Sequence, residues 1–122
     1  MAWEFSNDKP IYSQIIENIQ ISIISGEYAI GEKIPSVREL AVLASVNPNT
    51  MQRALQELEK EGLLFSKRTS GRFITEDKAM VEQLKENFAK KQIIDFYEKM
   101  KSIGLTKDEI IGYIRKTFGE MN

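Results

Sequence analysis

The sequence predicts a mainly α-helical fold with one small β-hairpin, in which a winged helix-turn-helix domain is followed by a two-helix tail. Apolar residues recur at helical spacing in five segments, and two short β-like runs follow the third segment. The chain has 122 residues, which is enough for one ordinary domain and an appendage. We therefore expect a winged domain over residues 1–75 and a C-terminal helical dimerisation region over residues 76–122.

The first two helices are indicated by their start signals and their apolar stripes. Pro10 suits a first helical turn, and apolar residues then recur at helical spacing until Gly26. Ser36 and Glu39 form a capping-box pattern, which opens a second, short helix that ends near Ser45. The connection between the two helices is rich in turn residues and has room for a short edge strand.

A third helix begins two or three residues later. Asn47 is a good N-cap and Pro48 a good first-turn residue, and the helical pattern continues to about Lys60. At about 100° per residue, one side of this helix is apolar and the other is polar and cationic. The polar side carries Asn49, Gln52, Arg53, Gln56 and Lys60.

The hairpin and the tail complete the chain. Two β-like runs, LLFSKR and GRFIT, meet at Thr69 and Ser70, which predicts a hairpin or wing. A long helical pattern then runs to about Met100. Thr106 and Glu109 form a second capping-box pattern, which opens the last helix.

The composition excludes several functional classes. The chain has no cysteine and no histidine, so it lacks disulfides, thiolate metal sites and the commonest metal ligand and general base. Carboxylates concentrate only at Glu57, Glu59 and Glu61, without a neighbouring nucleophile or glycine-rich loop. No apolar run approaches the roughly 20 residues that cross a bilayer, and no export signal is visible. We expect a cytoplasmic protein that is not an enzyme and has no cofactor.

The net charge of −1 conceals an uneven distribution of charge. Residues 1–32 carry one basic and five acidic side chains, whereas residues 33–72 carry seven basic and four acidic ones. DNA-binding domains are usually basic, so the whole chain is atypical. The basic excess nevertheless coincides with the predicted helix-turn-helix and hairpin, and it predicts a local cationic surface.

Three helices followed by a hairpin, with a short turn between the second and third helices, form the layout of a winged helix-turn-helix. In this motif the outer face of the third helix enters a major groove, where amide and guanidinium groups match base edges. A glycine in the wing permits close approach to a minor groove. On this reasoning the candidate DNA-binding residues are Arg38, Asn49, Thr50, Gln52, Arg53, Arg68, Gly71 and Arg72.

Residues 10–74 contain the motifs P-I-Y-x-Q-I, I-P-S-V-R-E-L-A, V-N-x-N-T-M-x-R-A-L-x-E-L-E-x-E-G-L-L and S-G-R-F-I. This run closely resembles the DNA-binding domain of the GntR family of bacterial regulators. The helical tail of 47 residues is similar to that of the short YtrA-type subfamily and differs from branches with large metabolite-binding domains. The resemblance implies DNA contacts by Arg38, Asn47, Asn49, Thr50 and Gln52, with Arg68 and Gly71 serving in the wing.

Four positions depart from the family pattern. A glycine is usual at the positions of Ser45 and Thr69, and a leucine at that of Ala44. Pro48 stands where some relatives have a polar or basic contact residue. These differences predict a stiffer wing tip, altered packing in the turn after the second helix, and the loss of one hydrogen-bond donor.

The tail is too short to enclose a metabolite, so no dedicated small-molecule pocket is expected. Its amphipathic helices must bury their apolar stripes, and the tail of a second copy is the natural partner. A two-fold dimer also presents two reading helices to a palindromic site. The alternative is that the tail folds back on its own winged domain. The expected interface consists of Phe88, Ile93, Phe96, Tyr97, Ile103, Ile110 and Ile114.

The sequence therefore favours a transcription regulator that binds double-stranded DNA sequence-specifically and represses as a homodimer on a palindromic operator. The alternative is a winged-helix module for protein–protein contacts. In that case the exposed face of the third helix would be acidic or apolar, whereas here it is cationic and rich in amides.

Overall fold

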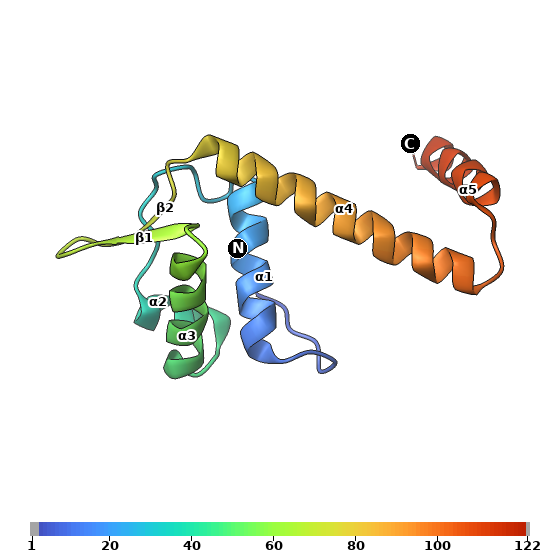
Figure 1. Ribbon diagram of the computed structural model, residues 1–122. Helices are drawn as coiled ribbons and strands as arrows, with labels where there is room; N and C mark the ends of the chain where they lie inside the picture. The colour runs from blue at the N-terminus through green and yellow to red at the C-terminus, as the bar shows by residue number, and fades with distance from the viewer. Residues whose placement is uncertain (1–2, 122) are drawn as a thin grey trace. The chain divides into compact units, whose positions relative to one another are not determined.

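The computed structural model describes residues 3–121, and these residues confirm the predicted fold class: five helices and one two-stranded hairpin (Figure 1). The elements follow the order α1 (Ile11–Ile24), α2 (Val37–Ala44), α3 (Pro48–Lys60), β1 (Leu64–Lys67), β2 (Gly71–Ile74), α4 (Lys78–Ser102) and α5 (Lys107–Glu120). The chain divides between Leu84 and Lys85, within α4, into two compact units.

The predicted helix starts are present as hydrogen-bonded caps. At α2, the Glu39 backbone N–H donates to the Ser36 hydroxyl at 3.2 Å, and the Ser36 N–H donates to the Glu39 carboxylate at 3.3 Å. The same reciprocal pair joins Thr106 and Glu109 at α5. Pro10 lies one position earlier than expected, as the N-cap residue of α1. The caps satisfy backbone donors that a helix leaves free at its first turn.

One apolar core holds the first unit together. The apolar stripes of α1, α2 and α3 meet in it, and residues from both strands and from the start of α4 complete it. Burial of these stripes is the main force that fixes how the three helices pack. Its fully buried larger side chains are Ile15, Ile19, Leu40, Met51, Leu55, Leu58, Leu64 and Ile74.

The glutamine of the first motif has a structural role. Gln14 is buried near the start of α1, and its amide donates to the carbonyl oxygens of Ser6 at 2.9 Å and Lys9 at 2.8 Å. In return, the Ser6 backbone N–H donates to the Gln14 Oε1 at 2.8 Å. These bonds tie the N-terminal segment to the helix and satisfy the polar atoms of a buried side chain.

The wing is an antiparallel hairpin in which Leu64 lies opposite Ile74, and Lys67 lies opposite Gly71. The connection between α1 and α2 runs alongside β2 and pairs with it over a short stretch. The Ile74 N–H donates to the Glu32 carbonyl at 2.8 Å, and a single β-bridge pairs Lys33 with Phe73. The short edge strand that the sequence suggests is therefore reduced to one bridge, and it anchors the base of the wing.

The turn between α2 and α3 consists of residues 45–47. Ser45 adopts the left-handed conformation, with φ 56° and ψ 46°, and it is the one non-glycine residue with a positive φ in the described part of the chain. Glycine takes this conformation without strain. The turn thus keeps a backbone geometry suited to the family's usual glycine, although serine occupies the position.

The second unit contains α4 from Lys85 onward and the whole of α5. Ile110 is the one buried apolar residue of this unit among the residues that the structure describes, with 5% of its surface exposed. Several large apolar side chains on both helices are exposed, including Ile93 at 64% and Phe118 at 65%. In residues 3–121 no helix combines the length and the apolar character needed to cross a membrane.

Candidate nucleic-acid interface

The two faces of α3 differ in burial as the helical pattern predicts. Met51, Ala54, Leu55 and Leu58 are fully buried on the inner face. On the opposite face Asn49, Arg53, Gln56 and Lys60 are exposed, and Gln52 is half-buried. The outer face of α3 thus presents amide and cationic groups on a helix whose inner face is fixed by the core.

The start of α3 is built around Asn47. Its side-chain Oδ1 accepts a hydrogen bond from the Asn49 backbone N–H at 2.7 Å, so Asn47 caps the helix. The amide NH₂ of Asn47 is an additional donor group, and the residue itself is exposed. Thr50 is half-buried one turn further on. Pro48 has no N–H and the Asn49 N–H is bonded to Asn47. The positive dipole of the helix start and the side-chain donors of Asn47 and Thr50 therefore favour an anion such as a phosphate here.

Arg38 lies in the first turn of α2 and is exposed. Later in the same helix Val42 is 78% exposed and Leu43 is 62% exposed. The outward side of α2 therefore combines one cation with two apolar side chains, while Leu40 and Ala41 face the core.

The wing carries exposed cations at its tip. Lys67 and Arg68 are exposed, and the Lys67 ammonium lies 4.7 Å from the centroid of the Phe73 ring. Phe73 in turn stacks on Phe65 at 5.7 Å between ring centroids. This aromatic pair supports the cation, because the face of an aromatic ring attracts positive charge.

Gly71 follows the turn of the wing with a φ of +103°, a conformation that side chains rarely adopt. A Cβ at this position would also lie 3.1 Å from the Lys33 Cε. Thr69 does not have a positive φ, so the backbone makes no special demand for the glycine usual at that position.

Arg72 joins the wing to α3. Its Nε lies 2.6 Å from the Glu59 carboxylate, which also accepts a hydrogen bond from the Ser66 hydroxyl at 2.6 Å. Its Nη1 lies 3.5 Å from the Gln52 Oε1. The hydrogen bond from Ser66 and then that from Arg72 lower the pKa of the Glu59 carboxyl below its ordinary value. We call these four residues the wing clasp.

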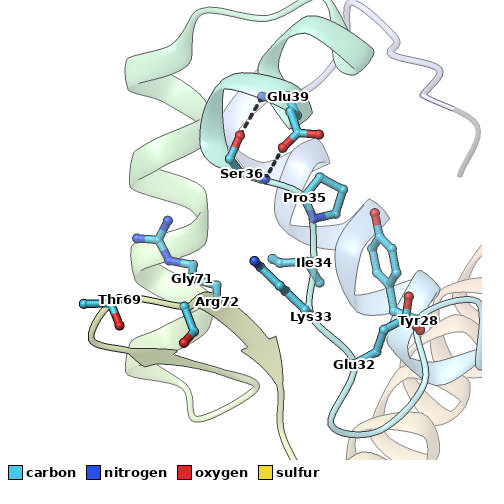
Figure 2. Close-up of a pocket in the computed structure, with 11 residues that line it drawn as sticks. Tyr28, Glu32, Lys33, Ile34, Pro35, Ser36, Glu39, Thr69, Gly71 and Arg72 are labelled. Carbon is cyan, nitrogen blue, oxygen red and sulfur yellow. Dashed lines mark hydrogen bonds between the residues drawn. The ribbon is translucent and has the colours of Figure 1, made fainter.

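A groove of about 690 Å³ separates the start of α2 from the tip of the wing (Figure 2). It is lined by the connection between α1 and α2, by Ser36 and Glu39, and by the wing-tip residues 69–72. The Lys33 side chain lies in this groove, as Figure 2 shows. In addition to the amide and cationic side chains of α3, the first compact unit carries exposed cations on α2, in the wing and in the connection between α1 and α2. They are Lys33, Arg38, Lys67 and Arg68.

The dimer residues expected in the tail differ in their exposure. Ile93, Phe96 and Ile103 are exposed, with Ile103 at 67%. Phe88, Tyr97 and Ile114 are half-buried. Ile110 is buried within the single chain. Exposed apolar side chains also occur at positions outside the expected set: Ile94, Ile111, Tyr113, Phe118 and Met121.

Sequence reasoning missed Glu59, Ser66 and Lys33. In the sequence Glu59 stands out only as part of an acidic cluster, although it lies seven residues, or about two helical turns, after Gln52 on the same face. That spacing, together with an arginine in the hairpin, was the available signal for the wing clasp. Nothing in the sequence marked Lys33, because its position depends on the bridge to Phe73.

Comparisons with known proteins support a regulatory site. Residues 11–74 match the family described as bacterial regulatory proteins, gntR family. The uncharacterized HTH-type transcriptional regulator YhcF of Bacillus subtilis (strain 168) is 41% identical over 117 residues, which cover 96% of each chain. The HTH-type transcriptional repressor YtrA of the same strain is 44% identical over 68 residues, 56% of this chain and 52% of YtrA.

Two solved structures are also similar. A GntR family transcriptional regulator from Listeria monocytogenes shares 42% identity, with a TM-score of 0.86 over 92% of this chain and 98% of that chain. The DNA-binding domain of AraR in complex with an operator shares 30% identity, with a TM-score of 0.55 over 59% of this chain and 93% of that chain.

Proposed function

Since the chain belongs to the GntR family of bacterial DNA-binding transcription regulators, we propose that it represses transcription as a homodimer bound to a palindromic operator. The family resemblance predicted from the motifs is confirmed, and relatives of this chain include both regulators and repressors. We also propose that it acts in the cytoplasm, without an enzymatic step.

The exposed polar face of α3 is the observation that carries this proposal. Asn49 and Arg53 are exposed and Gln52 is partly so, while the opposite face of the helix is fully buried. A major groove about 12 Å wide admits one helix and offers base edges that amide and guanidinium groups can match. We propose that this face reads bases in the major groove.

Around α3, Arg38 and the start of the helix supply contacts to phosphates. Asn47 and Thr50 lie at that start, where the positive helix dipole and the two side-chain donors favour an anion. We propose that Arg68 and Gly71 in the wing lie at the minor groove, because the positive φ of Gly71, +103°, shapes the turn that carries the exposed Arg68.

The salt dependence of DNA binding tests this function. Affinity for a random-sequence duplex should fall steeply with salt concentration, because the protein releases counterions when it neutralises phosphates. Arg38→Ala or Arg68→Ala should lower the slope of log K against log salt by about 1 if either residue contacts a phosphate. Lys91→Ala, which removes an exposed cation from α4, is the matched control and should leave the slope unchanged.

A flat salt dependence in the wild-type protein would instead favour a winged-helix module for protein contacts. The exposed pair Val42 and Leu43 on α2 is the one apolar feature of the α2–α3 region that such a module could use. Fluorescence anisotropy with labelled duplex measures both quantities, and heparin retention gives a rapid first comparison.

The exposed apolar surface of the C-terminal helices is the reason for proposing a homodimer. Ile93, Phe96 and Ile103 are exposed, and burying such side chains stabilises an assembly by about 25 cal/mol for each Å² removed from water. A two-fold dimer also matches the symmetry of a palindromic site. We therefore propose that the tail pairs with the same tail of a second chain.

Sedimentation of the intact protein at micromolar concentration tests the dimer. Ile93→Glu should shift the population to monomers, because it would bury a charge in an apolar interface. The neighbouring substitution Gln92→Glu places the same side chain on an exposed polar position and should leave the dimer intact. A wild-type protein that sediments as a clean monomer would remove the homodimer from the proposal.

A further inference from the structure

The wing clasp connects both strands of the hairpin to one carboxylate of α3. Ser66 and Arg72 lie directly opposite each other in the hairpin, so their side chains leave the same face of the wing. Both donate to the Glu59 carboxylate at 2.6 Å. A charge-assisted bond of this kind is shorter and stronger than a neutral one, and here it fixes the direction of the Arg72 guanidinium.

The fixed guanidinium then faces Gln52. Its Nη1 lies 3.5 Å from the Gln52 Oε1, and the Arg72 side chain is only 18% exposed. Gln52 and Glu59 are about two turns apart on one face of α3, and Arg72 spans the gap between them. The acceptor atom of Gln52 is therefore directed towards Arg72, and its Nε2 donor group is left for another partner.

Base recognition by glutamine depends on which of its atoms are available. Adenine presents an acceptor and a donor in the major groove, so a glutamine that pairs with it in bidentate fashion needs both its NH₂ and its Oε1. Guanine presents two acceptors, O6 and N7, and requires donors only. A glutamine whose Oε1 faces an arginine keeps both hydrogens of its NH₂ for a guanine edge, whereas pairing with adenine would require the same Oε1 to accept a second hydrogen bond.

We propose that Arg72 is a positioning residue, held by Glu59, that orients Gln52 to donate to a guanine in the operator. This inference rests on the proposed DNA-binding function and names the base that one residue reads. It also gives Arg72 a role different from the direct DNA contact expected from its place in the wing. Ser66 supports the arrangement by donating to the same carboxylate.

Selection of bound sequences from random DNA, followed by affinity measurements, tests the proposal. The operator position read by Gln52 is identified as the one at which Gln52→Ala no longer prefers a particular base. In the wild type this position should be guanine, preferred over adenine by about fivefold or more, as expected for a good side-chain–base pair. In Glu59→Gln and Arg72→Ala, Gln52 is no longer oriented by Arg72 and should also pair with adenine. The preference for guanine over adenine should therefore fall or reverse.

Arg72→Lys separates positioning from charge. Lysine keeps the positive charge but has a single ammonium group, so it cannot hold Glu59 and face Gln52 through two nitrogens of a planar fork. The guanine preference should therefore fall in Arg72→Lys, while the salt dependence of binding to random duplex stays unchanged. Thermal unfolding of each variant checks that the winged domain is still folded, and Ser66→Ala provides a milder perturbation with an intermediate loss of preference.

Two results would overturn the inference alone. One is that the wild-type protein selects adenine, and not guanine, at the operator position whose base preference depends on Gln52. The other is an Arg72→Ala variant whose salt slope falls by about 1 while its base preference is intact, which is the behaviour of a phosphate contact. Failure of the wild-type protein to enrich any sequence, with flat salt dependence, would overturn the proposed function and this inference together.

Discussion

The guanidinium carbon of Arg53 lies 4.7 Å from the centroid of the Tyr12 ring, so an exposed arginine of α3 is stacked against α1. A guanidinium over an aromatic face is attracted by the ring quadrupole, which is worth about 0.5–1 kcal/mol at exposed sites. Tyr12 packs against the hydrophobic core and is itself held in place. The stacking therefore restricts Arg53 before any DNA is bound.

From this contact we predict that Tyr12 contributes to DNA affinity without touching DNA. Arg53→Ala should cost about 1–3 kcal/mol on a selected operator if Arg53 reads a base. Tyr12→Leu should cost less, about 0.5–1 kcal/mol, because Arg53 remains but loses its support. Fluorescence anisotropy on the selected operator measures both losses.

A double-mutant cycle provides the control for this prediction. If Tyr12 acts through Arg53, the Tyr12→Leu loss should disappear in the Arg53→Ala background, since contacting residues are not additive. Equal losses from Tyr12→Leu in both backgrounds would show that the tyrosine affects binding by another route.

Asn47 allows helix stability and DNA binding to be separated. Its side chain caps α3, and replacing such a cap with alanine typically costs about 1 kcal/mol of stability. Asn47→Ala should therefore lower both the thermal midpoint and the affinity for DNA. Asn47→Asp keeps the capping oxygen and suits the helix dipole, so the thermal midpoint should be retained while a negative charge near phosphate lowers affinity. An Asn47→Asp protein that binds DNA as well as the wild type would remove Asn47 from the interface.

The features that could be predicted from sequence are those encoded by neighbouring residues. The caps at Ser36 and Thr106 each depend on a partner three positions later, and the wing turn depends on a few residues near Gly71. The inner and outer faces of α3 follow from the regular rotation of a helix. For these features, local backbone geometry and residue chemistry point to the same answer.

The contacts that sequence did not reveal join elements that are distant along the chain. The Arg72–Glu59 ion pair requires the hairpin register that places Ser66 opposite Arg72, and also the docking of the hairpin beside α3. The stacking of Arg53 on Tyr12 depends on how α1 packs against α3. Periodicity identifies which face a residue occupies, but the packed core decides which partner it meets.

Ser45 marks a place where a stabilising substitution is expected. Its φ of 56° puts a side chain in the left-handed region, which costs an ordinary residue roughly 1–2 kcal/mol and costs glycine little. Glycine loses more conformational entropy on folding, which offsets part of this benefit. We therefore expect Ser45→Gly to raise the free energy of unfolding by about 1 kcal/mol and the thermal midpoint by about 4–8 °C. Ser45→Ala keeps the Cβ and should give no such gain. A glycine variant no more stable than the alanine variant would contradict strain at this turn.

The final prediction concerns the pH dependence of stability and follows from Glu59. The hydrogen bond from Ser66 and then that from Arg72 lower the pKa of the Glu59 carboxyl in the folded protein below its ordinary value of 4.5. A carboxyl with a depressed folded-state pKa contributes stability above its unfolded pKa, and the contribution is lost as the pH falls through the folded-state pKa. Glu59→Gln removes the titrating group and should therefore destabilise the protein at about pH 7 but much less at about pH 3.

Urea denaturation of wild type and Glu59→Gln at the two pH values measures this difference. Glu61 provides an opposing effect, because burial and then Glu57 raise the pKa of its carboxyl. Since Glu61 is present in both proteins, its contribution largely cancels in the comparison. Ser66→Ala removes the largest cause of the shift and should show a smaller loss with the same dependence on pH. A difference between wild type and Glu59→Gln that stays constant from neutral to acidic pH would mean that the wing clasp does not favour the ionised carboxylate.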